Sequence, residues 1–307
     1  MLYPVEYNNF YRLVESVCFE VRLPFRFSNF SKKMYGNFVH VFLCVYKEKL
    51  NLSYRRFVEV CRENNLQRML CIKKIPHFTT IQKFIQRMDK KLFEKLVRAC
   101  RKLLNLKNIT AAIDGTGFSN TNPSQYYQNR INAERVKNYT KTVFLTDINT
   151  KLILAIDTQS NHTHETIHFK PLVKQLGNCL KTILADKGYD SMSNRKYCWN
   201  NNIDVHIPFR KYERTNREEK GLPTKRELHE RKFDKNLYNK RALIESVNSA
   251  IKQTLGGFVR ARTAQNQQKN VTIKALAYNI ERIGRTIKIR LWIEIQQDFY
   301  TAVRSYF

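Results

Sequence analysis

Long apolar runs, glycine and proline are all scarce in this sequence, and each scarcity excludes a class of protein. Only 9 glycines and 7 prolines occur among 307 residues, too few for a collagen-like or low-complexity disordered chain. The longest apolar run, residues 38–46, is interrupted by His40 and is shorter than the ~18 residues of a membrane-spanning helix. The first ten residues lack the basic and then apolar pattern of a signal sequence. We therefore expect a folded cytoplasmic protein without a membrane span.

Paired cysteines are also missing. The seven cysteines are odd in number and widely scattered, and no C-x-x-C pair occurs. The sequence therefore predicts neither a disulfide framework nor a zinc ribbon. We expect the cysteines to be reduced thiols.

Acidic residues are too few to balance the basic ones. The 55 Lys and Arg stand against 26 Asp and Glu, a net charge of +29. A surplus of this size needs a polyanion, and nucleic acid is the usual partner. An anionic membrane surface is the competitor, but the basic residues are spread along the chain and do not form one amphipathic helix. The charge therefore predicts a nucleic acid as the partner.

Residues 1–105 have helical periodicity and predict an all-α domain. One helix is predicted after an N-cap at Ser53, and a second after a cap at Thr79 or Thr80. The outer face of the second helix carries Gln side chains together with Lys83 and Arg87. Two such helices suit a helix-turn-helix that contacts DNA through the second helix, although a plain helical bundle also fits the pattern.

From residue 106 the sequence changes to short apolar runs bounded by turn residues, which is typical of strands. Two of these runs are separated by N-T and predict a hairpin. The predicted order is β-β-β-α-β-α-β-α, with strands at 109–114, 140–148, 151–158, 182–186 and 203–209. This is the order of the ribonuclease H-like α/β fold, a mixed sheet flanked by helices. We assign this domain to 106–290 and a helical tail to 291–307.

Three acidic residues occupy matching positions in that topology. Asp114 is predicted to end the first strand and Asp186 the fourth, while Glu245 lies on the helix after the fifth. The first and fourth strands are neighbours in such a sheet, so the carboxylates are expected to meet at one edge. Clustered carboxylates repel one another and need cations, and oxygen-only ligands favour Mg²⁺ or Mn²⁺. Two such ions support in-line phosphodiester cleavage.

The stretch Y-N-K-R-A-L-I-E-S-V-N-S-A-I-K begins at residue 238 and places four chemically distinctive side chains on one helix face. If it is one α-helix, Tyr238, Arg241, Glu245 and Lys252 project within roughly 60° of arc. The opposite side is apolar and is predicted to be buried, with Leu243, Val247, Ile251 and Leu255. A solvated face with an Arg241–Glu245 ion pair is the simpler interpretation of this segment alone.

Three motifs together resemble the DDE transposases of insertion sequences, and most closely the group gathered around insertion sequences four and five. They are A-I-D-G-T-G-F-S around Asp114, L-A-D-K-G-Y-D-S around Asp186, and Y-x2-R-x3-E-x6-K around Glu245. The resemblance covers residues 107–285. It implies that the three acids are catalytic and hold two Mg²⁺ or Mn²⁺ ions.

The resemblance also implies a reaction and its partners. In the family the helix signature grips the transposon-end strand, which gives DNA contacts to Tyr238, Arg241 and Lys252. Cleavage would occur at terminal inverted repeats, and the 3′ ends would be joined to target DNA. Because two ends are processed together, we expect a homodimer on DNA. A nuclease that cuts without joining, and a non-catalytic DNA-binding protein derived from a transposase, remain alternatives.

Other polar residues near these motifs have simpler interpretations. His162, His164 and His168 in N-H-T-H-E-T-I-H could bind zinc, but no spaced Cys or His completes a structural site. We interpret them as a loop and the first turn of a helix that could lie near the active site. Asp157 and Asp190 are predicted to be turn or capping residues. The charged segment 211–232 is predicted to be a solvated loop that touches DNA.

Overall fold

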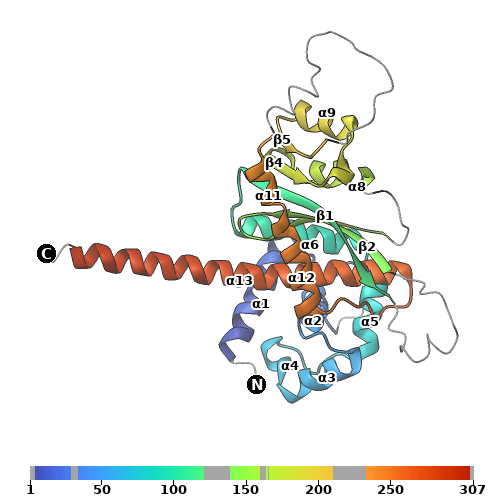
Figure 1. Cartoon of the computed structure of the whole chain (residues 1–307). Coiled ribbons are helices and arrows are strands. Elements are labelled where there is room, and N and C mark those ends of the chain that lie inside the picture. The colour runs from blue at the N-terminus through green and yellow to red at the C-terminus, as the bar shows by residue number, and fades with distance from the viewer. Residues whose placement is uncertain are drawn as a thin grey trace, which may run out of the picture. The chain divides into compact units, whose positions relative to one another are not determined.

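The computed structural model describes residues 4–28, 34–120, 139–159, 164, 166–209 and 233–304, with side chains described up to residue 287 in the last helix. The chain divides into two compact units, drawn in Figure 1. The first contains residues 1–105, 120–122 and 251–307, and the second contains 106–119 and 123–250. Each unit is described by itself below.

The first unit is helical throughout its described residues. Its helices are α1 (Pro4–Glu20), α2 (Asn37–Lys49), α3 (Tyr54–Glu63), α4 (Leu66–Met69), α5 (Phe78–Arg87), α6 (Lys90–Leu103) and the long α13 (Ala264–Arg304). The helix α13 packs along α2 and α6, and α1 contacts α2, α6 and α13. Residues 41–46 of α2 are at most 2% exposed, so α2 is the central helix of this core. The expected all-α region is therefore present.

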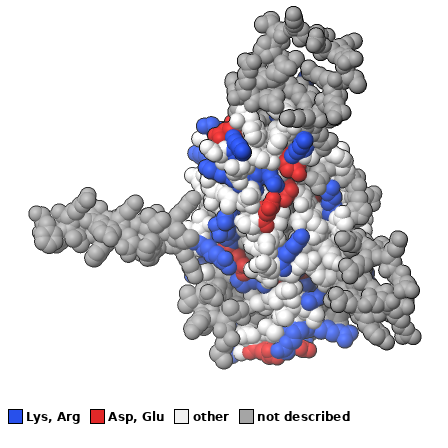
Figure 2. Space-filling view, in the orientation of Figure 1, with Lys and Arg blue, Asp and Glu red and all other residues white. Residues whose placement is uncertain are grey.

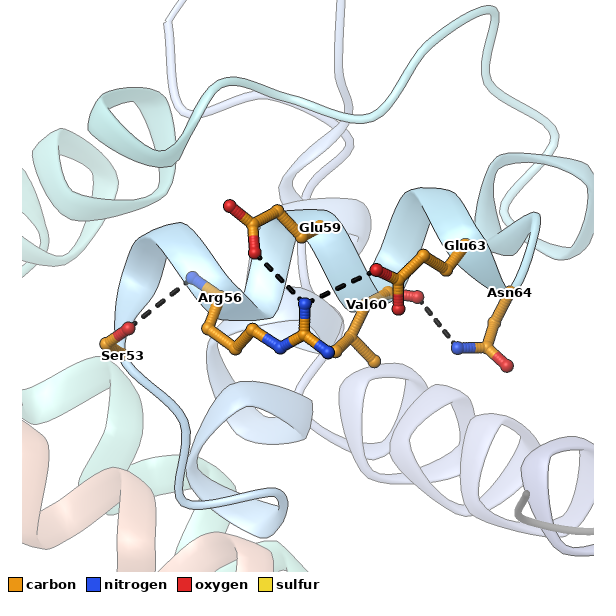
Figure 3. Close-up of polar contacts among 6 residues, drawn as sticks. All are labelled: Ser53, Arg56, Glu59, Val60, Glu63 and Asn64. Carbon is orange, nitrogen blue, oxygen red and sulfur yellow. Dashed lines mark hydrogen bonds and ion pairs between the residues drawn. The ribbon is translucent and has the colours of Figure 1, made fainter.

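The helix α3 begins as its sequence predicts. The Ser53 hydroxyl accepts the backbone N–H of Arg56 over 3.4 Å, which is an N-cap (Figure 3). On the outer face the Arg56 guanidinium lies 3.2 Å from Glu59 and 3.3 Å from Glu63. The basic charge of Arg56 is therefore balanced by two carboxylates of its own helix.

The start of α5 differs from the prediction. Its N-cap is His77, in extended backbone conformation, and not Thr79 or Thr80. The His77 imidazole Nδ1 lies 2.8 Å from the Thr79 hydroxyl, so this threonine belongs to the first turn and supports the cap residue. At the other end of α5, the buried Lys269 ammonium donates to the carbonyls of Ile85 and Gln86 over 3.1 and 2.8 Å. This contact fixes the C-terminus of α5.

A buried ionic triad joins α2 to α13 inside the first unit. The Glu48 carboxylate lies 2.7 Å from the Lys47 ammonium and 3.1 Å from that of Lys274, and all three side chains are at most 6% exposed. Burial alone would raise the pKa of Glu48, but the two ammonium groups lower it below its usual value. Burial lowers the pKa of Lys274, against the attraction of Glu48. One carboxylate therefore compensates two buried cations.

The second unit is built on a five-stranded mixed sheet. Its strands are β1 (Ile109–Ser119), β2 (Tyr139–Asp147), β3 (Ile153–Gln159), β4 (Leu180–Ala185) and β5 (Asp204–His206). The spatial order is β3-β2-β1-β4-β5. The strands β1, β2 and β3 pair antiparallel, while β4 pairs parallel to β1 and β5 parallel to β4. This is the predicted ribonuclease H-like sheet, with the predicted hairpin between β2 and β3.

Helices follow the strands in the predicted order. They are α8 (Thr166–Lys174), α9 (Met192–Asn200), α11 (Lys235–Asn239) and α12 (Ala242–Leu255), with single 3₁₀ turns η1 (Gly177–Cys179) and η2 (Lys187–Tyr189). The helix α8 packs on β2 and β3, and α9 packs beside β5. No helix within the described ranges is long and apolar enough to cross a membrane. The boundary between the two units falls inside α12, after Ala250.

Candidate active site

Asp114 lies in the middle of β1, which corrects the predicted strand end. The strand continues through the D-G-T-G motif to Ser119 and stays paired with β2 as far as Tyr139. The parallel pairing with β4 stops earlier, at Ile113 opposite Ala185. The predicted tight turn is therefore extended backbone, because β2 offers hydrogen-bond partners along its whole length. Asp114 is the first residue of β1 beyond the end of β4.

The strand register brings Asp114 and Asp186 next to each other. Ala112 pairs with Leu184 and Ile113 with Ala185, the last pair of this register, so Asp114 and Asp186 are the residues that directly follow it. Neighbouring strands lie about 4.8 Å apart, and residues in register point to the same face of a sheet. The two acids predicted to act together thus follow directly from neighbouring positions of β1 and β4.

A short turn holds Asp186. Its carboxylate accepts the backbone N–H of Gly188 over 2.7 Å, and a Cβ on Gly188 would lie 2.8 Å from the same oxygen. The turn ends at Asp190, whose carboxylate accepts from the buried Arg195 over 2.9 Å. Arg195 also donates to the Ile207 carbonyl over 2.7 Å, which ties the turn to the residues after β5. Asp190 is thus the C-cap residue of the turn, as predicted, and in addition the ion-pair partner of Arg195.

The signature segment is two helices and not one. The helix α11 ends at Asn239, and α12 begins at Ala242. At the junction Arg241 donates its backbone N–H to the Tyr238 carbonyl over 2.8 Å, and Ile244 donates to Arg241 over 3.0 Å. These are i to i+3 bonds, which wind the backbone more tightly than an α-helix. The predicted common arc for Tyr238 and Glu245 therefore does not apply, since it assumed an unbroken helix.

Arg241 nevertheless links two of the three predicted acids. One guanidinium nitrogen donates to the Glu245 carboxylate over 2.9 Å, and another lies 4.0 Å from that of Asp114. The Arg241 and Asp114 side chains are 20% and 19% exposed, whereas that of Glu245 is 59% exposed. Partial burial by itself lowers the pKa of Arg241, but the neighbouring phenol and carboxylates raise it overall. The cation therefore neutralises acids that would otherwise repel one another.

The described residues contain no group of three His, Cys, Asp or Glu side chains already arranged around a common metal position. In the second unit the Arg241 guanidinium lies between Asp114 and Glu245, and the Asp186 carboxylate is turned to Gly188. The donor set nevertheless fits Mg²⁺ or Mn²⁺, because it consists of oxygen atoms on adjacent elements. Coordination by all three acids stays a prediction.

Asn248 is a site residue that the sequence interpretation missed. Its carboxamide Nδ2 donates to the Asp114 carboxylate over 3.2 Å, and the residue is 8% exposed. It follows Glu245 by three positions, so both lie on neighbouring parts of the α12 surface. Of the predicted apolar face, Val247, Ile251 and Leu255 are at most 1% exposed, whereas Leu243 is half-buried and Ile244 is buried in its stead. The i to i+3 spacing from Glu245 was the available signal for Asn248.

Asp157 and His168 form a separate pair on the other face of the sheet. The His168 Nδ1 lies 2.7 Å from the Asp157 carboxylate. Asp157 is in register with Val143 and Gly115, and consecutive strand residues alternate faces, so it points away from the face of Asp114. Asp157 is a strand residue and not the predicted turn residue. His162 lies outside the described residues, as does the segment 211–232.

The predicted DNA contacts have mixed surroundings. Tyr238 is half-buried, and its ring centroid lies 5.3 Å from that of Phe233. Lys252 belongs to the first unit. Lys83 and Arg87 are exposed on α5 together with Gln82 and Gln86. On the face in Figure 2, Lys and Arg side chains recur throughout the coloured surface, and Asp and Glu occur in fewer places.

Comparisons with known proteins identify the family of this chain. Residues 106–280, over half of the chain, match the family model described as a transposase DDE domain. Among solved structures, the chain resembles a piggyBac transposase in a synaptic complex with hairpin DNA, with a TM-score of 0.44 and 13% sequence identity. That match covers 90% of this chain and 72% of the other. No curated protein matches the sequence.

Proposed function

The chain belongs to the family of transposase DDE domains, and from this premise we propose that it cleaves DNA at transposon terminal inverted repeats and joins the 3′ ends to target DNA. The observation that carries the proposal is the β1–β4 register, whose last pair, Ile113 and Ala185, directly precedes Asp114 and Asp186. The contacts of Arg241 with both Asp114 and Glu245 support including the third acid in the site. The net charge of +29 supports a polyanionic substrate.

Asp114, Asp186 and Glu245 are the proposed ligands of two Mg²⁺ or Mn²⁺ ions. Such ions supply activation of the attacking oxygen and stabilisation of the leaving oxygen in phosphodiester chemistry. The protein contributes the positions of the acids: Asp114 is fixed by the strand, Asp186 by its bond to Gly188, and Glu245 by α12. The Glu245 side chain is 59% exposed, compared with 19% for that of Asp114, which suits a ligand that also faces the DNA.

DNA contacts are proposed for both units. Tyr238, Arg241 and Lys252 would hold the transposon-end strand, since cations bind phosphates and an aromatic ring can stack on an unpaired base. In the first unit Lys83 and Arg87 would contact phosphates. Their helix α5 carries no acidic residue, whereas the cation of Arg56 on α3 is already paired with Glu59 and Glu63. We therefore propose α5 as the DNA-contacting helix.

Cleavage of a duplex that carries the DNA flanking the gene tests the activity. With Mg²⁺ or Mn²⁺ present, Glu245→Gln is expected to abolish strand cleavage while retaining DNA binding. Ser246→Ala is the matched control, because Ser246 is exposed on the next position of α12 and bonds only the Leu243 carbonyl among the contacts described. Undiminished cleavage by Glu245→Gln would overturn the assignment.

Two further readouts separate the remaining alternatives. An oligonucleotide with a free 3′ hydroxyl is expected to be joined to target DNA, whereas a simple nuclease would cut without joining. Binding without any metal-dependent cleavage would identify a non-catalytic DNA-binding protein.

Sedimentation with and without DNA is expected to show a homodimer on DNA.

The contribution of α5 has its own test. Lys83→Ala and Arg87→Ala are each expected to weaken binding to all DNA sequences and to lower the slope of log affinity against log salt by about 1. An unchanged slope would remove α5 from the interface. Gln82→Ala is the matched control, because it alters an exposed residue of the same helix without changing charge.

A further inference from the structure

Asn248 combines burial with an unsatisfied acceptor. The residue is 8% exposed, and its Oδ1 is buried without a hydrogen-bond partner among the residues that the structure describes. Its other amide atom, Nδ2, donates to Asp114 over 3.2 Å. A buried carbonyl oxygen without a donor costs free energy, so this orientation satisfies only half of the carboxamide. The acceptor half therefore gains no hydrogen bond from the described residues in this orientation.

The distance between Asn248 and Asp114 fits a shared ion. An octahedral Mg²⁺ ion holds its ligand atoms at about 2.1 Å. Two ligand atoms that make a 90° angle at the ion are then about 3.0 Å from each other. The amide atom of Asn248 that faces Asp114 is 3.2 Å from the carboxylate oxygen. Rotation of the carboxamide exchanges Nδ2 for Oδ1 at almost the same place, since the two atoms are nearly equivalent in shape. The rotated side chain then offers a second oxygen at ligand spacing.

We propose that Asn248 is an additional oxygen ligand of the ion held by Asp114, and that its carboxamide turns over when the ion binds. Without the ion, its N–H group holds the Asp114 carboxylate in place. With the ion bound, the Asn248 Oδ1 atom and the Asp114 carboxylate oxygen would face each other. Their mutual repulsion would be outweighed by the attraction of both atoms to the cation. The inference rests on the proposed function, because it assumes that Asp114 is a metal ligand.

The surroundings favour a neutral ligand at this position. Arg241 already lies between Asp114 and Glu245, so the metal-free site contains one cation beside two carboxylates. An additional carboxylate at Asn248 would add repulsion beside Asp114 before any ion is bound. A carboxamide supplies a ligand oxygen without that charge. Its place on the buried side of α12, next to Val247 at 1% exposure, also restricts where the side chain can go.

Mn²⁺ titration of the full-length protein without DNA, followed by electron paramagnetic resonance, tests the inference independently of activity. Asn248→Ala is expected to weaken Mn²⁺ affinity 10- to 100-fold, the range found for residues that support metal ligands. Asn248→Asp restores an oxygen and is expected to bind Mn²⁺ more tightly than Asn248→Ala. Ser246→Ala is the control and should bind Mn²⁺ like the wild type.

The possible results separate this inference from the proposed function. If Asp114→Asn loses Mn²⁺ binding while Asn248→Ala retains wild-type affinity, Asn248 is only structural and the inference is overturned alone. If Asp114→Asn and the wild type bind Mn²⁺ equally, or neither binds it, the proposed metal site fails as well. Thermal unfolding without Mn²⁺ distinguishes the two roles of Asn248, because a purely structural residue would lower the melting temperature of Asn248→Ala and leave its Mn²⁺ affinity unchanged.

Discussion

The Arg241 guanidinium donates a hydrogen bond to the Glu245 carboxylate over 2.9 Å. The same guanidinium lies 4.0 Å from Asp114. The positive charge of Arg241 therefore lies next to the carboxylates that are proposed to bind Mg²⁺ or Mn²⁺ from solution. Arg241 can serve DNA phosphates once the acids are compensated by metal ions, so metal binding and DNA binding are expected to depend on each other.

Arg241→Gln should separate these two roles. Removal of the guanidinium takes away a competitor for the carboxylates, so Mn²⁺ affinity without DNA is expected to rise several-fold. Affinity for DNA is expected to fall, because a phosphate contact is lost. Calorimetric titration with Mn²⁺ and a DNA-binding assay measure the two effects. A fall in both affinities would contradict the competition.

Gly188→Ala should damage the site with little effect on stability. The new Cβ would lie 2.8 Å from the Asp186 carboxylate oxygen, and that side chain can move away at small energetic cost. The displaced carboxylate is expected to reduce cleavage 10- to 100-fold. Thermal unfolding and DNA cleavage are the measurements.

Gly177→Ala is the control for that experiment. Gly177 has φ +55° and nothing within 4 Å of an added Cβ. Alanine in this left-handed conformation is expected to cost about 1 kcal/mol of stability, and cleavage should be unchanged. The two glycine variants are thus expected to show opposite patterns, and equal effects on cleavage would refute the role given to Gly188.

The buried triad should matter far more to stability than the surface ion pairs of α3. Glu48→Ala leaves the Lys47 and Lys274 ammonium groups without their carboxylate, and such a loss costs roughly 3–5 kcal/mol of unfolding free energy. Glu59→Ala breaks an ion pair whose side chains are more than half exposed, for which less than about 1 kcal/mol is expected. Denaturant unfolding compares the two, and equal losses would be inconsistent with this account.

His40 should make the first unit less stable in mild acid. Burial, with a smaller contribution from Arg87, lowers the pKa of His40 to about 4, and its ring stacks on Phe84 at 4.6 Å. Because the unfolded chain takes up a proton near pH 6.5, the folded state loses relative stability as the pH falls from 6.5 to 4. The loss from this residue is at most about 3 kcal/mol.

The measurement is the unfolding free energy across that pH range for the wild type and His40→Leu. The wild type is expected to lose more stability than the variant as the pH falls. His77→Gln alters an exposed histidine and serves as the control. Parallel pH curves for the wild type and His40→Leu would contradict the prediction.

Several parts of the fold could be predicted because they depend on neighbouring residues in the chain. The Ser53 cap, the amphipathic α3 and the β2–β3 hairpin follow from local spacing and turn chemistry. The motifs around Asp114, Asp186 and Glu245 also carried the family resemblance, and the family match covers all three residues.

Other features depend on pairing between distant segments and could not be predicted. The D-G-T-G motif resembles a turn, but hydrogen bonds to β2 extend β1 through it. The break before α12 was hidden because its residues have good helical spacing, and the actual backbone bonds around Arg241 are of the shorter i to i+3 kind.

The sequence by itself determined which segments are helices and strands, in what order, and which acids and cations are available, because these follow from short-range periodicity and composition. Only the tertiary structure decided that Asp114 and Asp186 follow the last paired residues of β1 and β4, that Asp157 points to the other face of the sheet, and that Asn248 reaches Asp114. Strand register and side-chain direction are set by long-range hydrogen bonding and packing, which no local pattern encodes.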